Sequence, residues 1–105
     1  MAKFSRDKGV RGERLIARKL HGKRIGVAFA STPVDVVTDF ADYQVKNYPL
    51  SSGAILDALK AMARQPGSDG RSRFVVWKPR RGTWLIVETM EQHIDHHVGG
   101  VSDAD

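Results

Sequence analysis

The sequence contains no cysteine and no long run of apolar residues. Without cysteine, the chain has no disulfide bonds, no thiolate zinc site and no cysteine nucleophile. No apolar stretch approaches the roughly 20 residues that cross a bilayer, and the basic N-terminal region lacks the apolar segment of a secretory signal. We therefore expect a cytoplasmic protein. Internal repeats, a Gly-rich phosphate loop and a GxSxG motif are also absent, which excludes the enzyme classes built on them.

Positive charge is distributed unevenly along the chain, whose formal net charge is +5. Residues 1–24 contain nine Lys and Arg against two acidic residues, and residues 64–82 contain six against one. Residues 83–105 contain five acidic residues and no Lys or Arg. Two basic segments beside an acidic end favour a polyanionic partner, of which nucleic acid is the commonest. A solvated basic surface is the alternative.

The length of 105 residues favours one domain, which we assign to residues 1–98, with 99–105 as a flexible C-terminal tail. The apolar runs 74–77 and 84–87 are typical of strands covered on both faces. Together with the other spacings they predict an α/β (α+β) fold, in which helices flank a mixed central sheet. The expected elements are a helix over about 5–20, a strand over 23–31, a hairpin over 34–46, a helix over about 51–64, strands over 74–77 and 84–87, and a short helix capped by Thr89 and Gln92.

The segment Val34–Lys46 predicts a β-hairpin that turns near Asp39. Side chains alternate across a strand, so three polar side chains of the second strand share one face: Asp42, Gln44 and Lys46. We expect Asp35 to lie opposite Val45 or Lys46, which brings a carboxylate and an ammonium together as a candidate active site. Asp42 is interpreted as an ordinary acid beside the turn.

Glu13 lies in the apolar stripe of the predicted first helix, on the same face as Ile16 and Leu20. Taken alone, it is interpreted as a boundary residue or as the partner of a nearby arginine. Asp35 and Lys46 taken alone form an ordinary cross-strand pair, which contributes well under about 1 kcal/mol. Basic residues elsewhere on this helix and in the turn 78–82 are candidates for phosphate contact: Lys8, Arg11, Arg14, Arg18, Arg80 and Arg81.

Three histidines lie near the C-terminal end of the sequence. His93 and His97 are one helical turn apart, a spacing that suits a transition metal. No HExxH motif or third acidic ligand accompanies them in the pattern. We therefore interpret His93, His96 and His97 as part of a solvated helix end.

Five short blocks follow one another between about residues 5 and 88: Lys8–Arg14, Val34–Val37, Gln44–Lys46, Phe74–Trp77 and Trp84–Glu88. Their order and spacing resemble the archaeal-type Holliday-junction resolvases of the PD-(D/E)xK nuclease superfamily. The resemblance implies a restriction-endonuclease-like αβββαββ core. It also implies a homodimer that hydrolyses phosphodiester bonds in four-way DNA during recombination and repair. The alternatives are a duplex endonuclease similar to Mrr and a non-catalytic DNA-binding module that keeps the nuclease fold.

The resemblance also implies a metal site. Glu13 and Asp35 match the family's ligands for Mg²⁺, with Mn²⁺ as the alternative ion, and the backbone carbonyl of Val45 is a further ligand. Gln44 and Lys46 match the (D/E)xK positions, where the lysine orients or helps to deprotonate the attacking water.

Three further positions follow from the same match. Ser31 or Thr32 is expected to contact the scissile phosphate. Gln44 departs from the family pattern because its neutral amide replaces an acid, which predicts weaker Mg²⁺ binding. Val34 stands where the superfamily name has proline, a departure that the resolvases share.

Overall fold

The computed structural model describes residues 2–25, 32–64, 70–79 and 81–98, with side chains from Lys8 onward. The predicted order of helix, three strands, helix, two strands and short helix is confirmed. The tail assigned to residues 99–105 lies outside the described residues. The elements are α1 (Ala2–Lys19), β1 (Lys23–Arg24), β2 (Val36–Val37), β3 (Ala41–Lys46), α2 (Ser52–Ala63), β4 (Ser72–Trp77), β5 (Leu85–Val87), α3 (Met90–His93) and the π-helix η2 (Ile94–Val98).

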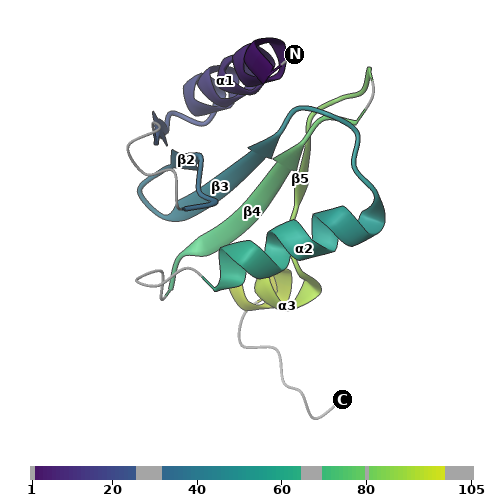
Figure 1. Ribbon diagram of the computed structural model, residues 1–105. Coiled ribbons are helices and arrows are strands. Elements are labelled where there is room, and N and C mark those ends of the chain that lie inside the picture. The colour runs from purple at the N-terminus through teal and green to yellow at the C-terminus, as the bar shows by residue number, and fades with distance from the viewer. Residues whose placement is uncertain (1, 26–31, 65–69, 80, 99–105) are drawn as a thin grey trace.

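The five strands form one mixed sheet in the order β1-β2-β3-β4-β5. Only β3 and β4 pair in parallel, from Ala41 opposite Ser72 to Lys46 opposite Trp77, and the other neighbours are antiparallel. A parallel pair requires a crossover, which α2 supplies. Figure 1 shows α1 and α2 on opposite sides of the sheet. The predicted α/β (α+β) class with a mixed, helix-flanked sheet is confirmed.

The sheet buries a different apolar cluster on each face. Ile16 and Ala17 of α1 pack with Tyr43 and Val45 of β3, which share a face as the strand alternation predicts. Ile55 and Ala58 of α2 form a second cluster with Val75 of β4. The polar residues of β3 therefore point away from the α1 cluster, because they alternate with Tyr43 and Val45.

The helix ends follow the capping residues of the sequence. Ser51 accepts a hydrogen bond from the Ala54 N–H at 3.1 Å, and Thr89 accepts one from the Gln92 N–H at 3.1 Å. The Gln92 side chain bonds instead to the backbone of Arg73 in β4, at 2.7 and 2.8 Å, which ties α3 to the sheet. None of the described helices combines the length and the apolar character that a membrane span requires.

The outer strands differ from the prediction. β4 is covered on both faces, since Val75 and Val76 are buried. The same prediction is wrong for β5, where Leu85 is 43% and Ile86 55% exposed. β5 is an edge strand, and a continuous apolar run does not distinguish an edge from a centre. β1 comprises only Lys23–Arg24, and the rest of its predicted span, residues 26–31, lies outside the described residues.

Candidate active site and basic cleft

Asp35 joins the three strands on the α1 side of the sheet. Its carbonyl accepts a hydrogen bond from the Ile25 N–H, and its own N–H donates to the carbonyl of Tyr43, both at 2.8 Å. Its carboxylate Oδ2 accepts from the Val45 N–H, also at 2.8 Å. The side chain is thereby fixed against the backbone of β3, on the residues that flank Gln44.

The register of the hairpin corrects the predicted partner of Asp35. Val36 pairs with Tyr43 and Val37 with Asp42, and the Asp35 N–H also donates to the Tyr43 carbonyl, so the backbone of Asp35 lies beside Tyr43 rather than opposite Val45 or Lys46. The tight turn, in which the Thr38 N–H donates to the Ala41 carbonyl at 2.9 Å, sets this register. The Asp35 carboxylate still reaches the Val45 N–H, whereas Gln44 pairs with Val75 of the α2 cluster and faces that side of the sheet.

The charge of Asp35 is costly where the fold places it. Burial raises the pKa of Asp35 to about 6, against the lowering effect of the Val45 N–H hydrogen bond. The nearby Glu13 carboxylate raises this pKa further, while Lys46 and Arg24 lower it. Glu13 and Lys46 thus both act electrostatically on Asp35, although the three residues come from distant parts of the sequence.

Glu13 is bound by an arginine, as the simpler interpretation of the sequence expected. The Nε of Arg24 donates to Oε1 of Glu13 at 2.9 Å, in a half-buried ion pair. Arg24 lies in β1 opposite Val36, the residue after Asp35. Sequence reasoning gave Arg24 no role, because its proximity to the site depends on the pairing of β1 with β2.

Gln44, a predicted metal ligand, has a buried side-chain oxygen. Its Oε1 is buried and has no hydrogen-bond partner within the described ranges of the chain. An unsatisfied buried acceptor costs about 1–3 kcal/mol. A hard divalent cation binds carboxylate and amide oxygens. The carboxylate oxygens of Glu13 and Asp35 therefore fit such an ion, whereas Val45 contacts Asp35 through its N–H and Gln44 lies beside Val75 on the α2 face of the sheet.

A basic cleft of about 580 Å³ opens beside this group. It reaches the candidate site through Tyr48, whose ring centroid lies 5.8 Å from Nζ of Lys46. Among the residues that the structure describes, the lining includes four cationic side chains and no carboxylate, which suits a polyanion. The residues that line it are Lys8, Arg11, Asn47, Tyr48, Pro49, Lys78, Pro79 and Arg81.

The cleft walls are held together by close contacts between α1 and the end of β3. The Asn47 side chain donates to the Lys8 carbonyl at 3.3 Å, and a Cβ at Gly12 would lie 3.1 Å from the Asn47 side chain. On the other wall, the Lys78 N–H donates to the Lys46 carbonyl at 2.9 Å. Arg81 adopts a positive φ of 50° at the turn before β5.

The predicted phosphate-contacting residues separate into groups. Lys8, Arg11 and Arg81 line the cleft. Arg14 and Arg18 are exposed on α1 but do not line it. Arg80 and Ser31 lie outside the described residues. Sequence reasoning missed Lys78 and Asn47, although Lys78 belongs to the same basic turn as Arg81.

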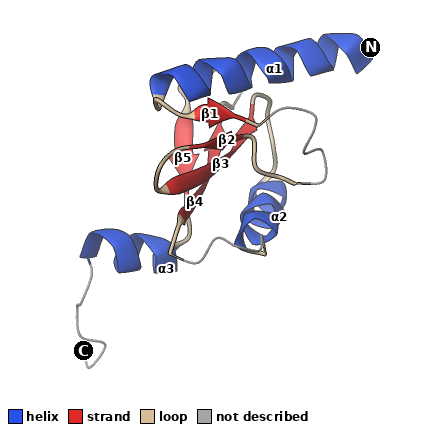
Figure 2. Cartoon of the chain, turned by 90° about the vertical axis from the view of Figure 1, so that its left-hand side faces the viewer, coloured by secondary structure: helices blue, strands red, loops and turns tan. Residues whose placement is uncertain are grey.

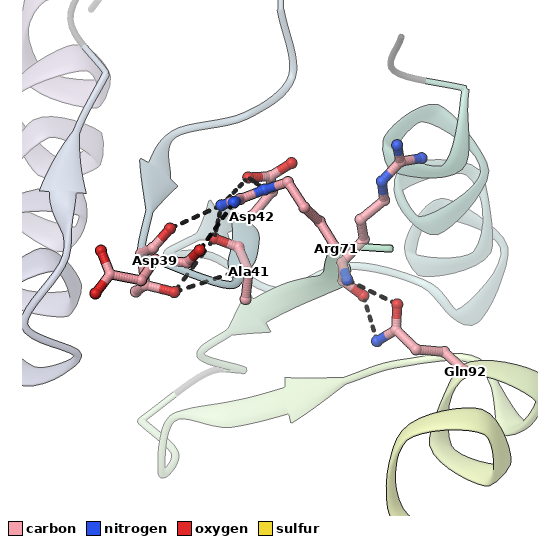
Figure 3. Close-up of polar contacts among 7 residues, drawn as sticks. Asp39, Ala41, Asp42, Arg71 and Gln92 are labelled. Carbon is pink, nitrogen blue, oxygen red and sulfur yellow. Dashed lines mark hydrogen bonds and ion pairs between the residues drawn. The ribbon is translucent and has the colours of Figure 1, made fainter. Parts of the chain in front are cut away.

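Asp42 belongs to a separate network and is more than an ordinary acid beside the turn. It is only 7% exposed, and Arg71 binds its Oδ1 at 2.9 Å. The same guanidinium donates to the carbonyls of Thr38 at 2.7 Å and Ala41 at 2.9 Å, and Figure 3 shows it spanning the turn. Arg71 thereby fixes the hairpin whose register sets the Asp35 carboxylate against the Val45 N–H.

Comparison with known proteins gives no match: no family model, curated protein or solved structure matches the chain. The functional inference therefore rests on the residues and their geometry. The carboxylates of Glu13 and Asp35 lie close enough to Lys46 for electrostatic interaction with Asp35, and a cleft lined with cations opens beside Lys46. This arrangement suits a divalent cation and a polyanionic ligand.

Proposed function

We propose that the chain is a metal-dependent DNA endonuclease whose preferred substrate is a four-way junction. The observation that carries the proposal is the convergence of Glu13 and Lys46 on the buried carboxyl group of Asp35, beside the basic cleft. The resemblance of the sequence blocks to junction resolvases supports the same activity. A restriction-endonuclease-like core, cytoplasmic location and a role in recombination or repair belong to this proposal.

The carboxylates of Glu13 and Asp35 would hold the ion, Mg²⁺ or Mn²⁺. A bound ion of this kind lowers the pKa of a coordinated water and neutralises charge on a phosphate. The Asp35 carboxyl, with a pKa of about 6, is largely ionised at neutral pH and therefore able to serve as a ligand. Arg24 acts as a positioning residue, because its bond to Oε1 fixes the Glu13 carboxylate.

Lys46 contributes the cationic group of the proposed site. Its ammonium carries three donors and remains a compact charge, which suits the orientation of an attacking water. The same charge stabilises the negative charge that develops on the phosphoryl oxygens during attack. Lys46 is therefore the residue whose loss most directly removes chemistry without removing the ion's ligands.

The basic cleft positions the substrate. Contacts from Lys8, Arg11 and Arg81 to phosphates fix the DNA relative to the site and carry no base information. Such a surface recognises backbone shape more than sequence. Symmetric cutting of a junction requires two sites, so the proposal includes a homodimer.

The test incubates purified protein with a labelled four-way junction in Mg²⁺ or Mn²⁺. The expected result is cleavage that requires the ion and that Lys46→Ala and Asp35→Asn each reduce by at least about 100-fold, the scale of general acid–base contributions. Cleavage equal to that of Lys46→Ala in both ions would overturn the proposal. A linear duplex of the same sequence distinguishes a junction resolvase from a duplex endonuclease similar to Mrr.

A second candidate is a non-catalytic DNA-binding module that keeps this fold. The ion pair of Glu13 with Arg24 and the neutral amide of Gln44 favour it, since both reduce the charge available to a metal. This candidate predicts binding that falls steeply with salt, needs no metal and is unchanged by Asp35→Ala. Binding without cleavage in either ion would support it.

A further inference from the structure

Three metal-binding side chains gather at the end of the sheet away from Lys46. A ligand atom from each of Glu88, His93 and His97 lies within 4.8 Å of the other two. Nδ1 of His93 is 2.9 Å from Oε2 of Glu88, and the two imidazole rings stack with centroids 4.8 Å apart. The acidic partner missing from the sequence pattern is therefore Glu88, five residues before His93.

The carboxylate of Glu88 is fixed before any ion binds. It is 17% exposed, and its Oε1 accepts a hydrogen bond from Nε2 of Gln92 at 2.9 Å. Gln92 is held in turn by both backbone groups of Arg73 in β4. Burial raises the pKa of Glu88, but hydrogen bonds from Gln92 and His93 and the nearby imidazoles outweigh it, so this pKa lies below its ordinary value. Supporting bonds of this kind orient metal ligands.

The helix geometry brings the two imidazoles together. His93 ends α3 and His97 lies in the π-helix η2, a rare form that is frequent at functional sites. His96 points elsewhere, because its Nδ1 is 2.8 Å from Oγ of Ser72. Of the three histidines, only His93 and His97 therefore face Glu88.

We propose that Glu88, His93 and His97 bind a transition-metal ion of the Zn²⁺ class. Two imidazoles and one carboxylate suit this class and not Mg²⁺, which prefers oxygen ligands. With bonds of about 2.0–2.2 Å, ligand atoms of a tetrahedral zinc lie roughly 3.4 Å apart, so the cluster closes by small shifts of two exposed imidazoles. A water completes the fourth position.

The site is separate from the candidate nuclease centre. Val87 pairs with Val75, so the end of β5 lies near the start of β4, whereas Lys46 lies at the end of β3 opposite Trp77. Figure 2 shows α3 at the other end of the molecule from α1, which carries Glu13. A bound ion links β5 to α3 and η2, and thereby stabilises the last helical segment on the sheet.

The experiment titrates tag-free protein with Zn²⁺ by calorimetry and follows its thermal midpoint, with Mg²⁺ as the comparison ion. We expect one Zn²⁺ per chain and a midpoint rise on the order of 10 °C at a hundredfold excess over the dissociation constant. Mg²⁺ at the same concentration produces no such rise through this cluster. Gln92→Ala, which removes the bond that supports Glu88 together with the two bonds to the Arg73 backbone, weakens Zn²⁺ binding by about 10–100-fold.

The ligand variants decide the outcome. His97→Ala and Glu88→Gln each weaken Zn²⁺ binding by at least the effect of Gln92→Ala, whereas the exposed histidine variant His21→Asn, matched as a control outside the cluster, leaves it unchanged. Asparagine at position 21 tolerates the positive φ of 54° found there. Unchanged Zn²⁺ affinity in His97→Ala, or an equal loss in His21→Asn, overturns the proposal. Circular dichroism of each variant without metal checks that it is folded.

Discussion

Residue scale: the buried carboxyl of Asp35 makes stability depend on pH. Its pKa is about 6 in the folded protein against 3.8 ordinarily. Below about pH 4 the group is protonated in both states and has no effect on stability. Between about pH 4 and 6 the unfolded state loses this proton while the folded state keeps it, so stability falls by up to about 3 kcal/mol and stays lower at higher pH.

Asp35→Asn should therefore stabilise the protein only at neutral and higher pH. In the absence of divalent ions, we expect the free energy of unfolding at about pH 8 to rise by about 1–3 kcal/mol over wild type, with no gain near pH 4. Urea denaturation with a chelator present measures both values. Equal gains at the two pH values would show that the ionisation of Asp35 is not the cause.

Gln44→Glu tests whether the buried side-chain oxygen of Gln44 belongs to the metal site, as the family pattern implies. A carboxylate at this buried position lowers the free energy of unfolding without metal by about 1–3 kcal/mol, because burial disfavours its charge. The added charge also tightens Mg²⁺ binding and speeds cleavage. Denaturation with and without Mg²⁺ and a junction-cleavage assay measure the two effects.

The matched control for that variant is Gln44→Leu, which removes the unsatisfied side-chain oxygen and adds no charge. It should be near neutral or stabilising without metal, since it removes an unsatisfied acceptor, and it should abolish the gain from Mg²⁺. A Gln44→Glu variant whose stability responds to Mg²⁺ no more than that of Gln44→Leu would argue against a metal at this position.

Element scale: the junction between α1 and β1 depends on a glycine. A Cβ at Gly22 would lie 2.7 Å from the Val37 carbonyl oxygen and 2.9 Å from Cγ1 of Val36. Gly22 also donates its N–H to the Ala17 carbonyl at 2.8 Å. The close approach lets β2 lie beside the end of α1, which places Asp35 within reach of Glu13.

Gly22→Ala should destabilise the protein by roughly 1–3 kcal/mol, because the nearest atom is backbone and the strand must shift. Gly9→Ala is the control, since no atom lies within 4 Å of a Cβ at that position in α1. It should stabilise by up to about 1 kcal/mol through helix propensity. Thermal denaturation of the two variants gives opposite shifts, and equal losses would contradict this account.

Molecule scale: the basic cleft collects cations from α1 and from the β4–β5 turn, which are far apart in the sequence. DNA bound there displaces counterions, so affinity falls as salt rises. Arg11→Ala should reduce the slope of log affinity against log salt by about 1. Fluorescence anisotropy with a labelled junction over a range of salt concentrations measures this slope.

Arg18→Ala is the control for that measurement. Arg18 is an exposed arginine of the same helix but does not line the cleft. Its loss removes the same charge and should leave the slope closer to that of wild type than Arg11→Ala does. Equal reductions by the two variants would mean that α1 contacts DNA along its length rather than through the cleft.

The sequence by itself determined the elements and the faces that they bury. The spacing of Ile16 and Ala17 and the alternation of Tyr43 and Val45 predicted the packed faces of α1 and β3, because burial of apolar side chains follows the helix and strand periods. The helix caps at Ser51 and Thr89 also depend on local sequence and follow the capping residues. The residues of the candidate site were named on the same local pattern and a family resemblance.

Only the tertiary structure decided which of these residues meet. The placement of Asp35 against the backbone of Tyr43 and Val45 depends on a register that the turn and the Arg71 network set, and no local spacing fixes it. Arg24 reaches Glu13, and Glu88 completes the histidine pair, through contacts that depend on how the sheet pairs and how the last helix docks. Charged residues from separate elements come close together only when those elements pack, so the sequence encodes their proximity only through the fold.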